Sequence, residues 1–154
     1  MSSPSAAFAT RPFLILDVEV GAPINIGPAG AANRRYVPIT GGKVSGAIEG
    51  VILPGGDWQT VHDDGNLEIE AHYAFRAADG SVIEVISNGV RAGPAAVLQR
   101  LQAGAVVDAR EYYFRTAIRF RTASPSWSHL NFRLAVSQGE RRPDSVRLEV
   151  FEVL

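Results

Sequence analysis

The sequence predicts an all-β fold: a single closed or nearly closed antiparallel β-barrel of about 8–10 strands, lipocalin-like in outline, with one short α-helix. The first observation is strict alternation across residues 66–76, in which every second residue is apolar: Leu67, Ile69, Ala71, Tyr73 and Phe75. That period is typical of a strand with one buried face. The second is a run of six glycines within residues 41–58, because glycine marks the bends that a closing sheet needs. The third is the Asp79-Gly80 hairpin signal.

The remaining elements follow from the same signals. Further strands are predicted at residues 13–20, 34–39, 81–88, 112–122, 129–137 and 144–153, with the glycine-rich strand ending at 54–56. Pro38 indicates an edge or a bend in its strand. A helix is predicted over Pro94–Ala103, since proline stands near its start and Gly104 follows its end. Residues 1–11 are expected to be a disordered N-terminal segment, and residues 12–154 a single barrel domain.

Length, charge and composition exclude several classes of protein. A chain of 154 residues fits one domain, and a net charge of −1 gives no electrostatic footprint for nucleic acid or an acidic membrane. There are no cysteines, which excludes disulfides, thiolate catalysis and cysteine-bound metal centres. No secretory signal and no apolar stretch of about 20 residues is evident. We therefore expect a cytoplasmic protein.

Motifs for metals, cofactors and nucleophiles are also missing. His62, His72 and His129 do not have the spacing of a metal site. There is no G-x-S-x-G elbow and no phosphate-binding loop followed by a helix. The sequence therefore predicts no metal and no cofactor.

Three residues are candidates for catalysis, each with a structural alternative. Asp57 follows a glycine bend and is either a turn or cap residue or a general base or orienting carboxylate. Tyr73 lies on the apolar face of its strand, so its hydroxyl would project into the interior and need a substrate or a structural partner. Arg91 ends a strand, where it could clamp a carboxylate or stand at a solvated rim.

Four further residues are candidates for substrate binding. Trp58 could form an apolar wall at the barrel mouth or plug the core. Tyr113 and Arg115 would offer a donor and a fixed positive charge if they point inward, but their strand face also suits solvent or an oligomer contact. Asn131, between two apolar residues of the predicted 129–137 strand, could be an oxyanion donor or a buried structural amide.

An ordered series of motifs spans residues 12–154. It comprises Pro38–Gly42 (PITGG), the Gly46/Gly50 pair, Leu53–Trp58 (LPGGDW), Asp79-Gly80, Gly89-Val-Arg91, Glu111–Thr116 (EYYFRT), Leu130-Asn131, Gly139-Glu-Arg141 and Val150–Val153. In this series the chain resembles the domain of unknown function 3237, also called UPF0311. The resemblance implies a closed β-barrel and brings no mechanism with it.

Two functions remain open at this point. The first is a cofactor-free enzyme that acts on a small carbonyl compound by acid/base chemistry, of isomerase, cyclase or lyase type. The alternative is a non-catalytic ligand carrier or sensor, whose interior should be nearly all apolar. The number of ionisable side chains that face the lumen distinguishes the two. A homo-oligomer is also possible through the edge-like segment 34–39 or the arginine-bearing face of 113–121.

Overall fold

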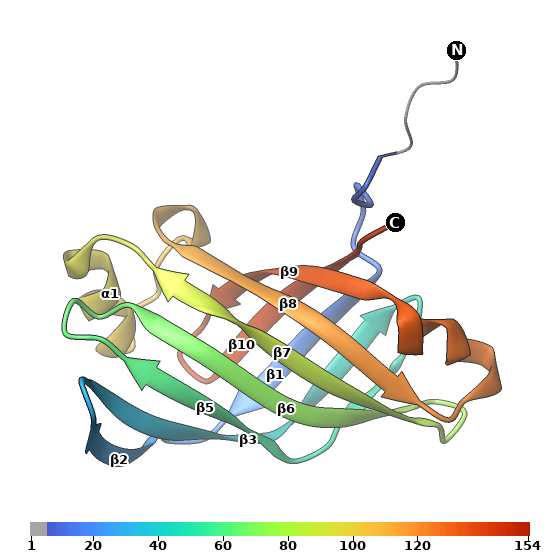
Figure 1. Cartoon of the computed structure of the whole chain (residues 1–154), viewed down its shortest axis with the longest axis horizontal. Helices are drawn as coiled ribbons and strands as arrows, with labels where there is room; N and C mark the ends of the chain where they lie inside the picture. Colours follow the sequence, from blue (N-terminus) through green and yellow to red (C-terminus); the bar gives the residue numbers. More distant parts are fainter. Residues whose placement is uncertain (1–5) are drawn as a thin grey trace.

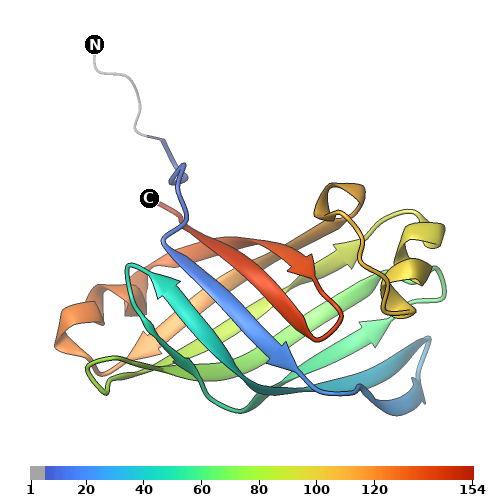
Figure 2. The same ribbon diagram turned by 180° about the vertical axis from the view of Figure 1, so that it is seen from behind.

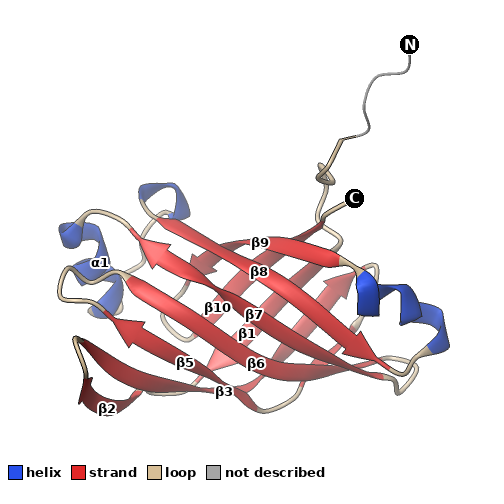
Figure 3. Cartoon of the chain, viewed as in Figure 1, coloured by secondary structure: helices blue, strands red, loops and turns tan. Residues whose placement is uncertain are grey.

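The chain forms a closed antiparallel barrel, as predicted. The computed structural model describes residues 6–154, in which the strands wrap around one axis (Figure 1). The strands are β1 (Leu14–Val20), β2 (Ile24–Ala29), β3 (Ala32–Gly46), β4 (Gly50–Ile52), β5 (Gly55–Val61), β6 (Leu67–Ala77), β7 (Val82–Ala92), β8 (Tyr113–Thr122), β9 (Leu134–Arg141) and β10 (Ser145–Glu152). The helices are α1 (Ala95–Gln102) and the 3₁₀ helices η1 (Ala109–Glu111) and η2 (Pro125–Phe132), which lie at the two ends of the barrel (Figure 3).

The long strand β3 closes the barrel. Its second half pairs with β1, which pairs in turn with β10, so that β1 lies between β10 and β3 (Figure 2). Its first half pairs with β2 on one side and β5 on the other. The short strands β4 and β5 occupy successive parts of one position between β3 and β6. The result is an eight-strand barrel with two extra strands.

Glycine allows the sheet to bend where β3 crosses from one neighbour to the next. Gly42 has a φ of +136°, and a Cβ there would collide with the carbonyl oxygen of Asp17 on β1. The pairing register shifts nearby, between Glu19 and Val20. A residue with a side chain fits neither the backbone conformation nor the close approach, so this bend depends on glycine.

The half of the lumen nearer η2 is a packed apolar core. Alternating side chains of β6 are buried, as the sequence period predicts. They pack with inward residues of the neighbouring strands, and the largest fully buried side chains include Phe75, Phe120, Leu14, Leu16, Ile52, Ile83, Ile118 and Leu130. This end of the barrel is therefore filled.

One predicted strand was wrong at its start. Residues 125–132 form η2 instead, and β9 begins only at Leu134. Pro125 begins the 3₁₀ helix, and the Asn131 side chain bonds the backbone N–H and C=O of Thr122. The side chain thus satisfies groups that a paired strand would have satisfied, and Phe132 is left 93% exposed.

Two other predictions concern the helix and the chain start. The predicted helix over 94–103 is confirmed as α1. Of the segment expected to be disordered, residues 1–5 lie outside the described residues, whereas Phe8 forms a β-bridge with Val153. No helix in residues 6–154 is long and apolar enough to cross a membrane.

Candidate functional site

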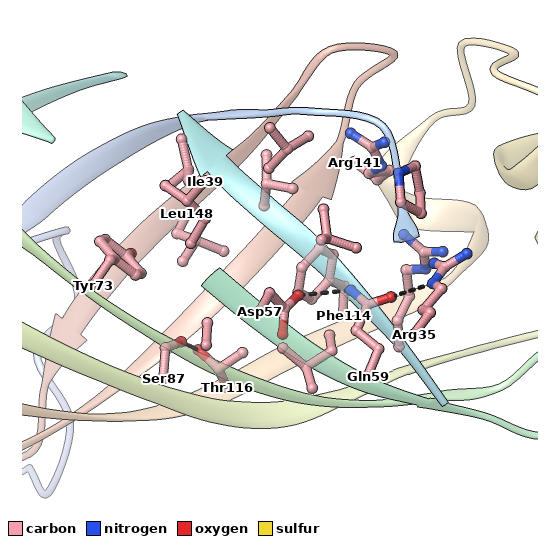
Figure 4. Close-up of a pocket in the computed structure, with 18 residues that line it drawn as sticks. Arg35, Ile39, Asp57, Gln59, Tyr73, Ser87, Phe114, Thr116, Arg141 and Leu148 are labelled. Atoms are coloured by element: carbon pink, nitrogen blue, oxygen red, sulfur yellow. Dashed lines mark hydrogen bonds between the residues drawn. The ribbon is translucent and has the colours of Figure 1, made fainter. Parts of the chain in front are cut away.

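The half of the lumen nearer α1 contains a cavity lined by both apolar and polar side chains (Figure 4). β7 ends shortly before α1 begins, so Arg91, the penultimate residue of β7, marks this end. The cavity has a volume of about 60 Å³, which is room for roughly four to six water molecules. Its polar lining residues are Arg35, Asp57, Gln59, Tyr73, Ser87, Arg91, Thr116 and Arg141.

Asp57 lies at the centre of this polar group. Its Oδ2 accepts a hydrogen bond of 2.6 Å from the Gln59 side-chain amide, whose oxygen accepts a bond of 2.7 Å from Arg35 Nε. Its Oδ1 is buried and has no hydrogen-bond partner. Burial raises the pKa of Asp57 to about 6, against the opposing effects of the Gln59 hydrogen bond, of the Glu70 backbone N–H, and of Arg35 and Arg91. The carboxylate is thus poised to exchange a proton near neutral pH.

Three arginines surround the cavity at its α1 end. Burial lowers the pKa of Arg91 to about 10, with repulsion from Arg35 and Arg141 adding to the effect. Burial also lowers the pKa of Arg35 and of Arg141. Arg141 Nη1 donates to the carbonyls of Arg142 and Ser145, at 2.6 and 3.0 Å. All three remain cationic at pH 7, so this end of the lumen carries a concentrated positive charge.

Tyr73 lies deeper in the barrel, next to the apolar core. Its side chain is buried, and its hydroxyl has no hydrogen-bond partner in the structure. Burial and the nearby charge of Asp57 raise the pKa of this phenol. The hydroxyl therefore stays protonated and can donate a hydrogen bond to an anion. A buried hydroxyl without a partner is costly, which makes this donor available to a ligand.

A short row of three hydroxyls begins in the cavity wall, where Ser87 and Thr116 line it. Ser87 donates to Thr116 at 2.8 Å, and Thr116 and Ser137 share a bond of 2.5 Å. These side chains satisfy one another and are all buried. They are a structural network that positions the wall between β7, β8 and β9.

The structure brings Asp57, Tyr73 and Arg91 together. All three line the one cavity, although they come from β5, β6 and β7. In Figure 4, Asp57 lies between Tyr73 on one side and Arg35 on the other. The three residues named as catalytic candidates therefore share one cavity.

The four residues expected to bind substrate lie outside this cavity. Trp58 is 45% exposed and stacks on Tyr36, with ring centroids 4.6 Å apart. Its neighbour Asp57 points inward, and successive side chains of a strand point to opposite faces. Tyr113 is likewise on the outer face, where the Arg115 guanidinium lies 5.1 Å from its ring centroid.

Asn131 is the fourth, and its side chain bonds backbone groups at a turn. Its side chain bonds the backbone of Thr122 and, at 3.0 Å, the carbonyl of Ser128. Those bonds hold η2 against the end of β8, at the end of the barrel opposite to α1. The polar atoms of this side chain are therefore used within the turn, and the residue does not line the cavity.

Sequence reasoning missed three charged or amide groups of the cavity, and the strand period could have found them. Arg35 stands two residues before the buried Val37 in the same strand, and Gln59 stands two residues after Asp57. Arg141 follows Ser137 at a spacing of four. Each stands an even number of positions from an inward residue of its strand, and such residues face the same side. The position in the strand therefore predicts an inward side chain even though the residue is polar.

The chain matches one protein family over nearly its whole length. The family described as "Protein of unknown function (DUF3237)" matches residues 8–153. A UPF0311 protein of Bradyrhizobium diazoefficiens is 36% identical over 94% of this chain and 96% of its own length. A UPF0311 protein of Clostridium acetobutylicum is 38% identical over 90% of this chain and 89% of its own.

Solved structures share the barrel. A conserved protein of unknown function from Rhodopseudomonas palustris has a TM-score of 0.89 at 36% identity, covering 99% of this chain and all of that one. An enzyme from Penicillium herquei has a TM-score of 0.72 at 18% identity, covering all of both chains. At that identity the likeness concerns the fold alone.

Proposed function

The chain belongs to the DUF3237 family, and we propose that it is a cofactor-free enzyme that moves a proton on a small carbonyl compound. The observation that carries this proposal is the carboxylate of Asp57. It lies in the wall of the cavity, has a buried Oδ1 without a side-chain partner, and has a pKa raised to about 6. A general base is most effective when its pKa lies near the working pH.

The proposed chemistry needs two groups. Asp57 Oδ1 removes a proton from the carbon next to the substrate carbonyl, and the electron pair of the broken C–H bond moves onto the carbonyl oxygen. The Tyr73 hydroxyl donates a hydrogen bond to the resulting enolate oxygen. In an isomerase, Asp57 then returns its proton to a different carbon of the enolate. In a cyclase, the enolate carbon bonds to an electrophilic double bond of the same molecule, and the electron pair displaced from that double bond takes the proton from Asp57. In a lyase, the bond from the neighbouring carbon to a leaving group breaks, and the leaving group departs with its electron pair and the proton from Asp57.

Arg91 supports both steps electrostatically. The Gln59 hydrogen bond, Arg35 and Arg91 together oppose the effect of burial on Asp57, whose pKa of about 6 leaves the base mostly ionised at pH 7. The positive charge of Arg91 also stabilises a developing oxyanion in the cavity. The carrier alternative is less well supported, because a carrier lumen should be nearly all apolar, whereas this one holds four charged groups beside the cavity.

Proton–deuterium exchange tests the proposal without a known substrate. A panel of small ketones, keto acids and enones is incubated with the protein in D₂O, and loss of α-proton signals is followed by ¹H NMR. We expect Asp57→Asn to abolish the exchange and Tyr73→Phe to slow it by about 10²-fold, since acid/base groups contribute roughly 10²–10⁴-fold.

Asp63→Asn is the matched control, because it makes the same change in an exposed turn. It should exchange at the wild-type rate. Exchange that survives in Asp57→Asn would remove the proposed base. Compounds that bind in the lumen and never exchange would favour the carrier.

A further inference from the structure

The charges that face the cavity do not balance. Among the described residues that line it, three are arginines, Arg35, Arg91 and Arg141, and a single one, Asp57, is acidic. With Asp57 ionised, the lumen holds an excess of two positive charges; with it protonated, three. Arg91 is buried, whereas Arg35 and Arg141 are partly exposed and Asp144 attracts Arg141. Excess positive charge around a buried guanidinium is unfavourable, so this end of the barrel suits an anion.

The arginines have donors to spare. Arg91 is only 5% exposed, and its Nε has no partner. Within residues 6–154, no carboxylate lies within 4 Å of any of the three guanidinium groups in an ion pair. Arg35 uses Nε for Gln59, and Arg141 uses Nη1 for two carbonyls. Each guanidinium has five N–H donors, so several remain for a ligand.

We propose that Arg35, Arg91 and Arg141, the arginine triad, bind the carboxylate of the substrate, and that the substrate class is small carboxylic acids with a second carbonyl group. The binding part of this proposal stands on the triad alone. The role of the second carbonyl rests on the proposed function. A carboxylate is a planar anion with two oxygens, which matches the fork of a guanidinium.

The order of groups along the lumen agrees with this substrate. Arg35 and Arg141 lie toward the α1 end, Asp57 lies next, and Tyr73 lies beyond it (Figure 4). A carboxylate held by the triad would direct the rest of a short molecule toward Asp57 and Tyr73. The cavity of about 60 Å³ suits a chain of a few carbon atoms. Anchoring of this kind orients the reacting carbon before proton transfer.

Charge can be tested separately from shape with pyruvate and pyruvamide, which differ by one charge and share the ketone. Binding of each probe is measured by NMR titration at pH 7.5 and low salt. We expect pyruvate to bind roughly 10- to 100-fold more tightly than pyruvamide, because a hydrogen bond to a charged group is worth that much. Equal affinity for the two probes would overturn the proposal.

Variants locate the binding. Arg91→Gln and Arg141→Gln should each weaken pyruvate binding by at least tenfold and leave pyruvamide unchanged. Arg119→Gln is the matched control, since Arg119 lies on the outer face of the same barrel. Arg141 is only partly buried, so Arg141→Gln keeps the test decisive if Arg91→Gln does not fold. Undiminished binding in the folded variants, or inorganic phosphate binding more tightly than pyruvate, would contradict the carboxylate assignment.

Asp57→Asn separates this inference from the proposed function. The variant keeps the triad and loses the base, so it should bind pyruvate at least as tightly as the wild type and exchange none of its protons. Triad-dependent pyruvate binding with no Asp57-dependent exchange of any compound would sustain the carboxylate site and reject the enzyme. Asp57-dependent exchange of neutral ketones, without preference for pyruvate, would support the enzyme and reject the carboxylate site.

Discussion

Replacing Asp57 by asparagine should make the protein more stable at pH 8, and this is the sharpest consequence of the buried carboxylate. Asparagine imitates the protonated acid in size and can still accept a hydrogen bond from Gln59. Burial raises the pKa of Asp57 from 3.8 to about 6. The folded protein therefore binds this proton more tightly than the unfolded chain does.

The sign and size follow from that difference. A group with a raised pKa stabilises the fold below its unfolded pKa, and the stabilisation is lost as the pH rises through the folded pKa. A shift of about 2 pKa units corresponds to roughly 3 kcal/mol. Asp57→Asn should thus gain about 3 kcal/mol in the free energy of unfolding at pH 8 and less than about 1 kcal/mol at pH 4.

Urea denaturation at the two pH values measures both quantities, and thermal melts give a second reading. For a chain of this size, 3 kcal/mol corresponds to a rise of roughly 6–12 °C in Tm. Asp63→Asn, in an exposed turn, should change neither value by more than about 0.5 kcal/mol. If Asp57→Asn were less stable at pH 8, the attraction of Arg35 and Arg91 would exceed the effect of burial, and the reasoning would be refuted.

Three further variants test other parts of the structure. Gly139→Ala should cost about 1–3 kcal/mol in urea denaturation, because its Cβ would lie 2.6 Å from the Phe114 ring. Gly21→Ala, whose Cβ would meet nothing closer than 3.6 Å, should be near neutral. Tyr73→Phe should leave stability unchanged or raise it by about 1–2 kcal/mol, since it removes an unpartnered hydroxyl; a loss would reveal a structural bond. Asn131→Ala should lower the free energy of unfolding by about 1–3 kcal/mol, because its hydrogen bonds to the backbone are lost; denaturation followed by circular dichroism measures this. The variant should still bind pyruvate in an NMR titration.

The barrel could be predicted because its strands have one apolar and one polar face. The alternation over residues 66–76 is sufficient by itself to identify the inward side of β6, including Tyr73. Segment 129–137 shows how the same signal can mislead. Its apolar residues also alternate, from Leu130 through Phe132 to Leu134, but Asn131 bonds the end of β8 and holds the first part in a 3₁₀ helix. A side-chain bond to a distant backbone is not visible in a local pattern.

The cavity could be predicted only in part, because an inward polar residue interrupts the pattern that reveals the inward face. Asp57 and Trp58 are adjacent in a strand, so they cannot both face the lumen. The sequence alone does not show which of the two side chains faces inward. Tyr113 and Arg115 are on the face opposite Phe114 and Thr116 for the same reason. What remained beyond the sequence is the convergence of Arg35, Asp57 and Arg91, which depends on closure of the barrel and on register between β3, β5, β6 and β7.

The two halves of the lumen meet opposite requirements, and this difference supports the proposed chemistry. The half near η2 is filled by side chains such as Phe75 and Phe120, whose burial stabilises the barrel. The half near α1 holds Asp57 and the arginine triad, of which Arg91 is buried and the others are partly buried, at a cost in desolvation that apolar residues of similar volume would avoid. Displaced pKa values in a cavity are typical of functional sites, and a carrier of apolar ligands has no use for them. If Asp57→Asn is both more stable and unable to exchange protons, then the same carboxylate lowers the free energy of unfolding and carries out the proton transfer.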